Sequence, residues 1–119
     1  MKDLKEFPNV FLYKPPVDMR KQIRGLSVLV QDSLDQNPFA DATLYVFCNR
    51  RRDLLKLIYW NHSGFAMWVT QLDQEKFPWP KRLQGETFIV TPAQFRMLLE
   101  GYDIWKIKKH KVLNFKSLT

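Results

Sequence analysis

Three consecutive arginines have the residue type and spacing to bind a polyanion. Arg50, Arg51 and Arg52 lie between Asn49 and Asp53, two residues that favour turns. Guanidinium groups pair with phosphate oxygens in a bidentate geometry, so three of them at the tip of a turn are suited to a nucleic-acid backbone. The same tip could hold an acidic protein partner, and a role in solubility alone is the plain alternative.

A second basic region contains aromatic residues. Lys76, Lys81 and Arg82 flank Phe77–Pro80. Interleaved cations and aromatic rings are typical of nucleic-acid surfaces, although Trp79 could equally be a core residue. The further candidate phosphate contacts are the basic residues Arg20, Lys21, Arg24, Lys56, Lys108, Lys109 and Lys111. The chain carries 19 Lys and Arg against 12 Asp and Glu, a net charge of +7 that favours nucleic acid without proving it.

Residues for catalysis or metal binding are sparse. The only cysteine is Cys48, which lies in a strand-like run and is expected to be a buried, inert thiol. His62 and His110 stand far apart, while a metal site needs three or four ligands. Asp32 and Asp35 could share a helix face but are interpreted as solvated charges. We therefore expect no enzyme, no metal or other cofactor and no small-molecule substrate.

Apolar spacing predicts one long helix near the N-terminus. Asp18 is the expected N-cap, and Asn37-Pro38 is the expected end. Gly25 in mid-helix should cost about 1 kcal/mol relative to alanine unless the helix packs closely on a sheet there. The expected buried stripe, with spacings of three and four, is Met19, Ile23, Leu26, Val30 and Leu34.

Three strand-like runs follow with short connections. They are Thr43–Cys48, Leu54–Trp60 and Phe65–Leu72, and connections this short predict an antiparallel meander. The first run is apolar on both faces, which indicates a central strand. Gly64 in the second connection is expected to supply a left-handed backbone conformation. Val10–Tyr13 and Thr87–Val90 are further short strand candidates.

A short C-terminal helix is predicted after these strands. Thr91–Gln94 has the pattern of a capping box with proline at the first helical position, and Gly101 is the expected stop. The overall expectation is a single α+β domain over residues 1–105. It is an antiparallel meander with the long N-terminal helix packed on the sheet and the short C-terminal helix beside it. Residues 106–119 are expected to be a flexible basic tail, and the location is expected to be cytoplasmic because no signal or membrane segment is evident.

The order of these segments resembles the small accessory protein, of the TnpB type, from the insertion-sequence sixty-six family. The resemblance covers about residues 10–105. The matching pieces are Val17–Lys21, Gly25-Leu26, Asn37–Phe39, Leu44–Phe47, Asn49–Trp60, Gly64-Phe65, Leu72, Phe77–Pro80, Thr91–Gln94 and Leu98–Gly101.

The resemblance implies a bacterial protein that is encoded beside a transposase and assists transposition without an established catalytic role. Its implied partners are DNA at the element ends, the transposase and the other element-encoded accessory protein. Two hypotheses remain open: direct DNA binding, and docking on the transposase without touching DNA.

Overall fold

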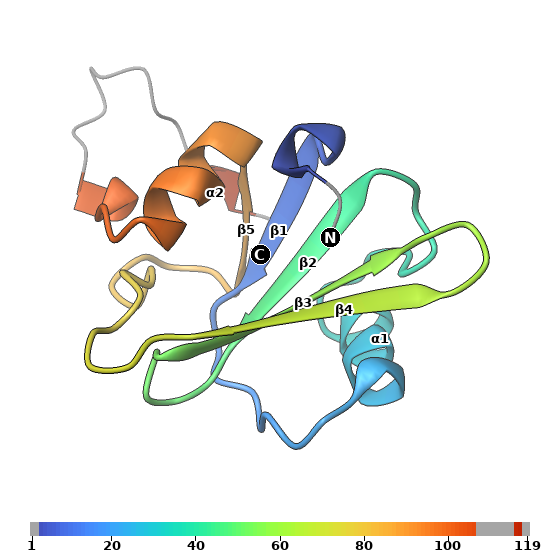
Figure 1. The fold of residues 1–119 in the computed structure, drawn as a ribbon, viewed down its shortest axis with the longest axis horizontal. Helices are drawn as coiled ribbons and strands as arrows, with labels where there is room; N and C mark the ends of the chain where they lie inside the picture. The colour runs from blue at the N-terminus through green and yellow to red at the C-terminus, as the bar shows by residue number, and fades with distance from the viewer. Residues whose placement is uncertain (1–2, 107–115, 118–119) are drawn as a thin grey trace.

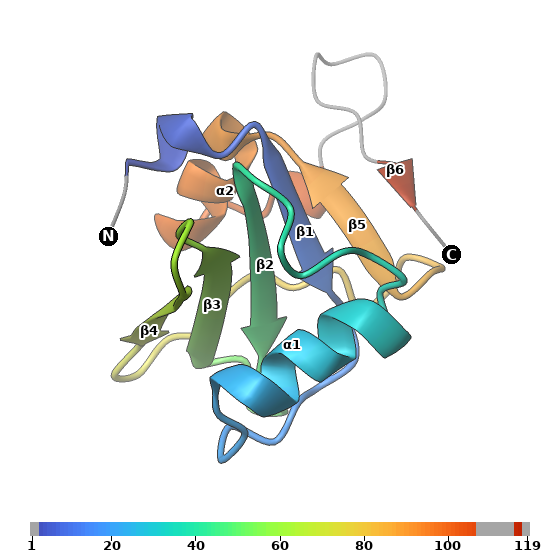
Figure 2. The ribbon, with the colours of Figure 1, turned by 90° about the vertical axis from the view of Figure 1, so that its right-hand side faces the viewer.

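The computed structural model describes residues 3–106 and 116–117, which form one mixed sheet with a helix on each face (Figures 1 and 2). The strand order is β4-β3-β2-β1-β5-β6. The strands are β1 (Asn9–Tyr13), β2 (Thr43–Cys48), β3 (Leu54–Trp60), β4 (Phe65–Gln71), β5 (Thr87–Val90) and β6 (Lys116–Ser117). The helices are α1 (Ile23–Asp32) and α2 (Pro92–Leu99), with 3-10 turns η1 (Leu4–Glu6) and η2 (Ile104–Lys106).

The predicted meander is present, but it is only part of the sheet. β2, β3 and β4 pair antiparallel in sequence order. β1 then pairs parallel to β2 and antiparallel to β5, so the sheet is mixed and the prediction of a purely antiparallel meander is wrong. The physical reason is the connection between the two strands. α1 follows β1 in the chain and crosses one face of the sheet, so that β2 starts at the same end as β1 and runs parallel to it. The coarser α+β expectation is consistent with the structure.

The prediction of a long N-terminal helix is also wrong. α1 begins at Ile23, and its N-cap residue Gln22 makes no side-chain capping bond. Asp18 instead accepts a hydrogen bond from the backbone N–H of Arg20 and pairs with its guanidinium at 2.6 Å. These bonds to Arg20 lower the pKa of Asp18 to about 2. The Lys56 ammonium binds the carbonyls of Met19 and Lys21, and Gln22 has an extended backbone, so the helix does not begin before Ile23.

α1 ends at Asp32, and the N–H groups of Ser33 and Leu34 both donate to the carbonyl of Leu29. Asp35, with a φ of 54°, then turns the chain away from the helix. The close packing of the helix on the sheet that was expected at Gly25 is also not found. A Cβ placed there would meet only the Lys21 side chain, at 3.5 Å, and no part of the sheet.

The two helices cover opposite faces of the sheet (Figure 2). Leu26 and Val30 of α1 pack with Tyr45 and Phe47 of β2. On the other face, α2 packs on the alternate residues of the same strand, including Val46. All six β2 residues are buried, as predicted for a central strand.

The C-terminal helix was predicted correctly. The Thr91 side chain accepts from the Gln94 N–H, and the Gln94 side chain accepts from the Thr91 N–H, which completes the capping box. Gly101 follows with a φ of 98°, a conformation that glycine adopts without strain. In the β3–β4 turn, however, the left-handed residue is His62, with a φ of 59°, and not Gly64.

Candidate nucleic-acid interface

The turn that carries the three arginines is held by side chains at both of its ends. The Asn49 side-chain oxygen accepts from the N–H groups of Asp53 and Leu54, each at 3.1 Å. Its amide nitrogen donates to the Asp53 carboxylate at 2.6 Å. Arg52, with a φ of 62°, makes the sharp bend between them. Asn49 and Asp53 therefore shape the turn, and the arginines between them are available for other contacts.

This turn is fastened to the long connection between β4 and β5. The carbonyl of Asp53 accepts from the Leu72 N–H, and the carbonyl of Arg52 accepts from the Phe77 N–H, both at 2.7 Å. The arginine turn and the aromatic segment are thus neighbours in space, although they were separate candidates in the sequence.

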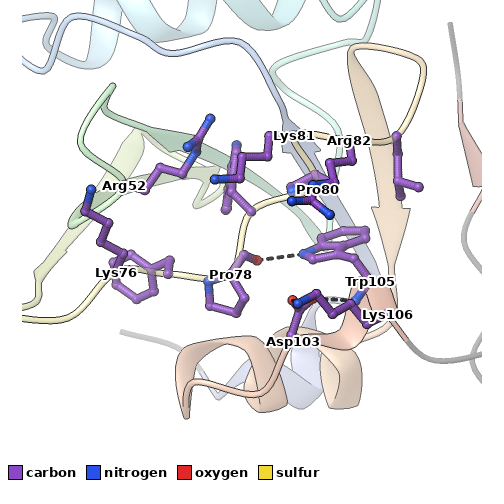
Figure 3. Close-up of a pocket in the computed structure, with 12 residues that line it drawn as sticks. Arg52, Lys76, Pro78, Pro80, Lys81, Arg82, Asp103, Trp105 and Lys106 are labelled. Atoms are coloured by element: carbon purple, nitrogen blue, oxygen red, sulfur yellow. Dashed lines mark hydrogen bonds and ion pairs between the residues drawn. The ribbon is translucent and has the colours of Figure 1, made fainter.

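A cleft of about 470 Å³ opens where these two segments meet η2 (Figure 3). Among the residues that the structure describes, five cationic side chains and one carboxylate line it. The lining residues are Arg52, Lys76, Phe77, Pro78, Trp79, Pro80, Lys81, Arg82, Leu83, Asp103, Trp105 and Lys106. The carboxylate of Asp103 lies 3.7 Å from the ammonium of Lys106, so the remaining four cations dominate the field in the cleft.

Aromatic residues form the wall of this basic cleft. Trp79 is buried, and its indole N–H donates to the carbonyl of Lys14 at 3.1 Å. Trp105 is half-buried, and its indole N–H donates to the carbonyl of Pro78 at 2.6 Å. The Trp105 ring also meets the Phe88 ring edge-on, with centroids 5.7 Å apart. Trp79 is therefore mainly structural, whereas Trp105 presents part of its ring to the cleft.

The three arginines of the turn occupy different surroundings. Arg52 lines the cleft, and Arg50 and Arg51 are exposed on the turn itself. Arg51 borders a separate shallow hollow that also contains Asp73 and Glu75, so acidic neighbours weaken its attraction for phosphate. The turn is one edge of a larger basic surface and not an isolated tip.

The other predicted contacts lie mostly elsewhere. Lys81 and Arg82 are exposed and line the cleft beside Arg52. Lys21 and Arg24 are also exposed but do not line it, and Arg20 is paired with Asp18. Lys108, Lys109 and Lys111 lie outside the described residues, as does most of the predicted tail. Within that tail, Lys116–Ser117 pairs with β5 as strand β6.

Lys56 has a different role from the one expected of it. Its side chain is buried, and its ammonium donates to the carbonyls of Met19 at 2.6 Å and Lys21 at 2.9 Å. A cation held in this way supports the loop before α1 and is not presented to a ligand. We therefore omit Lys56 from the interface proposed below.

Four of the lining residues were not among the site residues predicted from the sequence: Leu83, Asp103, Trp105 and Lys106. Trp105 was not among the candidates, and Lys106 was grouped with the tail lysines although it belongs to η2. The sequence feature that could have indicated these two residues is the pair Trp105-Lys106, an aromatic residue beside a lysine shortly after the end of the helix at Gly101. No local pattern indicates that this segment folds back against Pro78.

The remaining chemistry-bearing residues are not gathered into a site. Cys48 is fully buried, and burial raises the pKa of its thiol to about 12. His62 is exposed, 3.7 Å from the Asp41 carboxylate. Within residues 3–106 and 116–117, no three His, Cys, Asp or Glu side chains are grouped as metal ligands. In the same part of the chain no helix is long and apolar enough to cross a membrane.

The fold and the cleft define a small α+β domain with a basic, partly aromatic cleft. Residues 8–109 match the family described as IS66 Orf2 like protein. The chain therefore belongs to this family of accessory proteins of insertion-sequence transposition, which confirms the resemblance found in the sequence.

Two proteins of Sinorhizobium fredii (strain NBRC 101917 / NGR234) are similar to the chain. Uncharacterized protein y4hO is 37% identical over 89 residues, which is 75% of each chain. Uncharacterized protein y4jC is 33% identical over 97 residues, which is 82% of this chain and 81% of the relative. No solved structure matches the chain.

Proposed function

We propose that this protein is a non-catalytic accessory factor that binds DNA at the ends of its insertion sequence, in the cytoplasm, while the transposase acts. The observation that carries the proposal is the cleft, where five cations from three separate chain segments converge around one carboxylate. Arg52, Lys76, Lys81 and Arg82 are the principal phosphate contacts. Arg50 and Arg51 extend the surface along the adjoining turn.

The proposal makes a quantitative statement about salt. Each phosphate that a cation neutralises releases condensed counterions. It makes the slope of log affinity against log salt concentration steeper by about 0.9, in the negative direction. Because Lys106 is paired with Asp103, we count the four other cations of the cleft. Duplex DNA should then show a slope of about −3 to −4, steeper if the exposed arginines of the turn also engage.

The test is a salt titration of binding to labelled duplex DNA from an element end, followed by fluorescence anisotropy. The double variant Lys81→Ala/Arg82→Ala should flatten the slope by about 1.8. The control Lys5→Ala/Arg96→Ala also removes two exposed positive charges, but neither residue lines the cleft, so it should leave the slope nearly unchanged. Absence of binding at low salt, or equal slopes for the two double variants, would disprove DNA binding by the cleft.

A second candidate function is docking on the transposase, and the free side of β4 favours it. In the part of the chain that the structure describes, β4 is the last strand of the sheet, and its residues, Phe65–Gln71, include no charged side chain. Beside it, Phe39 is 54% exposed and its ring packs against those of Trp60 and Phe65. Such an edge fits an uncharged extended segment, which would add a strand to the sheet.

Co-purification with the transposase after nuclease treatment tests this second function. Val69 is 45% exposed on β4, so Val69→Lys should abolish the association without unfolding the protein. Lys81→Ala/Arg82→Ala should leave it intact. If the association disappears with nuclease, or survives Val69→Lys, docking through the β4 edge is incorrect.

A further inference from the structure

We propose that the cleft binds an unpaired nucleotide of a DNA strand, with the base against the Trp105 ring and the neighbouring phosphates on the surrounding cations. This inference rests on the proposed function and deepens it, because it names the form of DNA that the cleft selects. Duplex DNA would be a weaker ligand for the same residues.

The shape of the site is the first argument. A cavity of about 470 Å³ falls within the range of pockets that enclose small ligands, about 300–1,000 Å³. A duplex keeps the faces of its bases stacked inside and offers its backbone and base edges, so it has no base face to place on the Trp105 ring. Proteins that engage a single base take it out of the stack and hold it in such a pocket.

The wall of the cleft is the second argument. The ring of Trp105 is fixed by its hydrogen bond to the carbonyl of Pro78 and by the edge contact with Phe88, so stacking a base on it orders little additional structure. Pro78 and Pro80 complete the apolar wall, and proline has no backbone N–H that a base would leave unsatisfied. Base–aromatic stacking contributes about 1–3 kcal/mol per base and tolerates any sequence.

The placement of the charges is the third argument. Figure 3 shows Arg52 and Lys76 toward one end of the cleft, with Lys81 and Arg82 along one side and Lys106 beside Trp105. A strand that inserts one base can therefore place phosphates on cations on both sides of it. This arrangement of a backbone track around a stacking platform is typical of proteins that bind single strands.

The carboxylate of Asp103 in the cleft does not oppose this assignment. Asp103 accepts a hydrogen bond from the backbone N–H of Trp105 at 3.2 Å and lies 3.7 Å from the Lys106 ammonium. It therefore holds the segment that carries the stacking ring. The carboxylates of an acidic peptide would satisfy the cations, but only a peptide with an added aromatic residue could stack on Trp105. Every nucleotide carries a ring beside its phosphate, so the aromatic wall favours a nucleotide.

The experiment uses the full chain and four probes at one salt concentration. The probes are a single-stranded DNA oligonucleotide, its duplex, a strand of equal length without bases, and a polyglutamate peptide. Anisotropy gives affinities, and tryptophan emission reports stacking. We expect the single strand to bind at least tenfold more tightly than the duplex and to quench emission, and the strand without bases to lose this advantage.

Protein variants test the residue assignment. Trp105→Leu keeps an apolar side chain but removes the stacking platform, so it should weaken single-strand binding by about 5- to 150-fold, the equivalent of 1–3 kcal/mol. Its salt slope should stay near that of the unmodified protein. Trp60→Leu is the matched control, since Trp60 is also half-buried but packs with Phe39 and Phe65. If Trp105→Leu fails to fold, the comparison of strands with and without bases still decides the question.

The outcomes separate the two proposals. Equal affinity for single strand, duplex and baseless strand would overturn the unpaired-nucleotide inference and leave DNA binding standing. No binding to any of the three DNA probes would overturn both. Polyglutamate binding as tightly as the single strand would assign the cleft to acidic polypeptides and overturn the inference.

Discussion

Replacing the buried lysine of β3 should damage folding and leave DNA recognition intact. Lys56 is 7% exposed, and its ammonium donates to the carbonyls of Met19 and Lys21 in the loop before α1. Lys56→Met keeps most of the aliphatic stem in place but removes both hydrogen bonds. The change therefore measures the contribution of the ammonium group separately from that of the aliphatic part of the side chain.

The size of the effect follows from these two bonds. A hydrogen bond to a charged group contributes about 1.5–3 kcal/mol, which gives about 3–6 kcal/mol for two. The cost of removing an ammonium from water offsets part of this, and water can reach the loop carbonyls once Lys56 is gone. We expect a net loss of about 2–4 kcal/mol in the free energy of unfolding. For a chain of this length that lowers Tm by about 8–16 °C.

The assay pairs this variant with Lys76→Met, the same substitution at an exposed lysine of the cleft. Urea unfolding should show the loss for Lys56→Met and a change within about 0.5 kcal/mol for Lys76→Met. The salt slope for DNA should flatten by about 0.9 for Lys76→Met only. If Lys56→Met flattens the slope and leaves stability unchanged, Lys56 is a phosphate contact and its assigned role in the fold is incorrect.

Three further predictions concern stability. Gly25→Ala should raise the free energy of unfolding by about 0.5–1 kcal/mol in urea, because the added Cβ meets only the Lys21 side chain; a decrease would reveal a packing constraint on Gly25. Thr91→Ala should lower it by about 1 kcal/mol through loss of the helix cap, and a neutral result would mean that the capping box contributes nothing. Burial raises the pKa of Cys48 and of Tyr45 to about 12, so the unfolded chain loses these protons first and Tm should fall as the pH rises from about 9 toward 12. A Tm that is flat across that window would contradict the assignment.

Local patterns predicted the elements better than their arrangement. The bounds of β2, β3 and β5 and the cap of α2 follow from side-chain periodicity and turn chemistry, which act within a few residues. The parallel pairing of β1 with β2 depends on where α1 delivers the chain, and no periodicity encodes that. The predicted start of α1 was wrong for a related reason. Asp18 looks like a cap, but the ammonium of Lys56, which is distant in the chain, holds the carbonyls of Met19 and Lys21 in a loop.

The candidate site was predicted in pieces. The arginine turn and the basic aromatic segment were both evident, because they are contiguous in the chain. Their convergence depends on two backbone hydrogen bonds, from Leu72 to Asp53 and from Phe77 to Arg52, that link distant segments. Trp105 joins them through a hydrogen bond from its indole N–H to the carbonyl of Pro78, a contact that no spacing in the sequence predicts.

Charge in this protein therefore has to be interpreted residue by residue. Lys56 carries the same charge as Lys76, yet it is committed to backbone carbonyls, and Arg20 is committed to Asp18. The net charge of +7 therefore does not show which cations can meet a ligand. Within the described part of the chain, the cleft is a place where several uncommitted cations lie beside an aromatic wall. Asn49 and Asp53 build the turn that places Arg52 at that cleft. The segment Asn49–Asp53 therefore combines residues that shape the fold with a residue that lines the cleft. Asn49 and Asp53 at its ends shape the turn, and the arginines between them are the residues that we propose for contact with DNA.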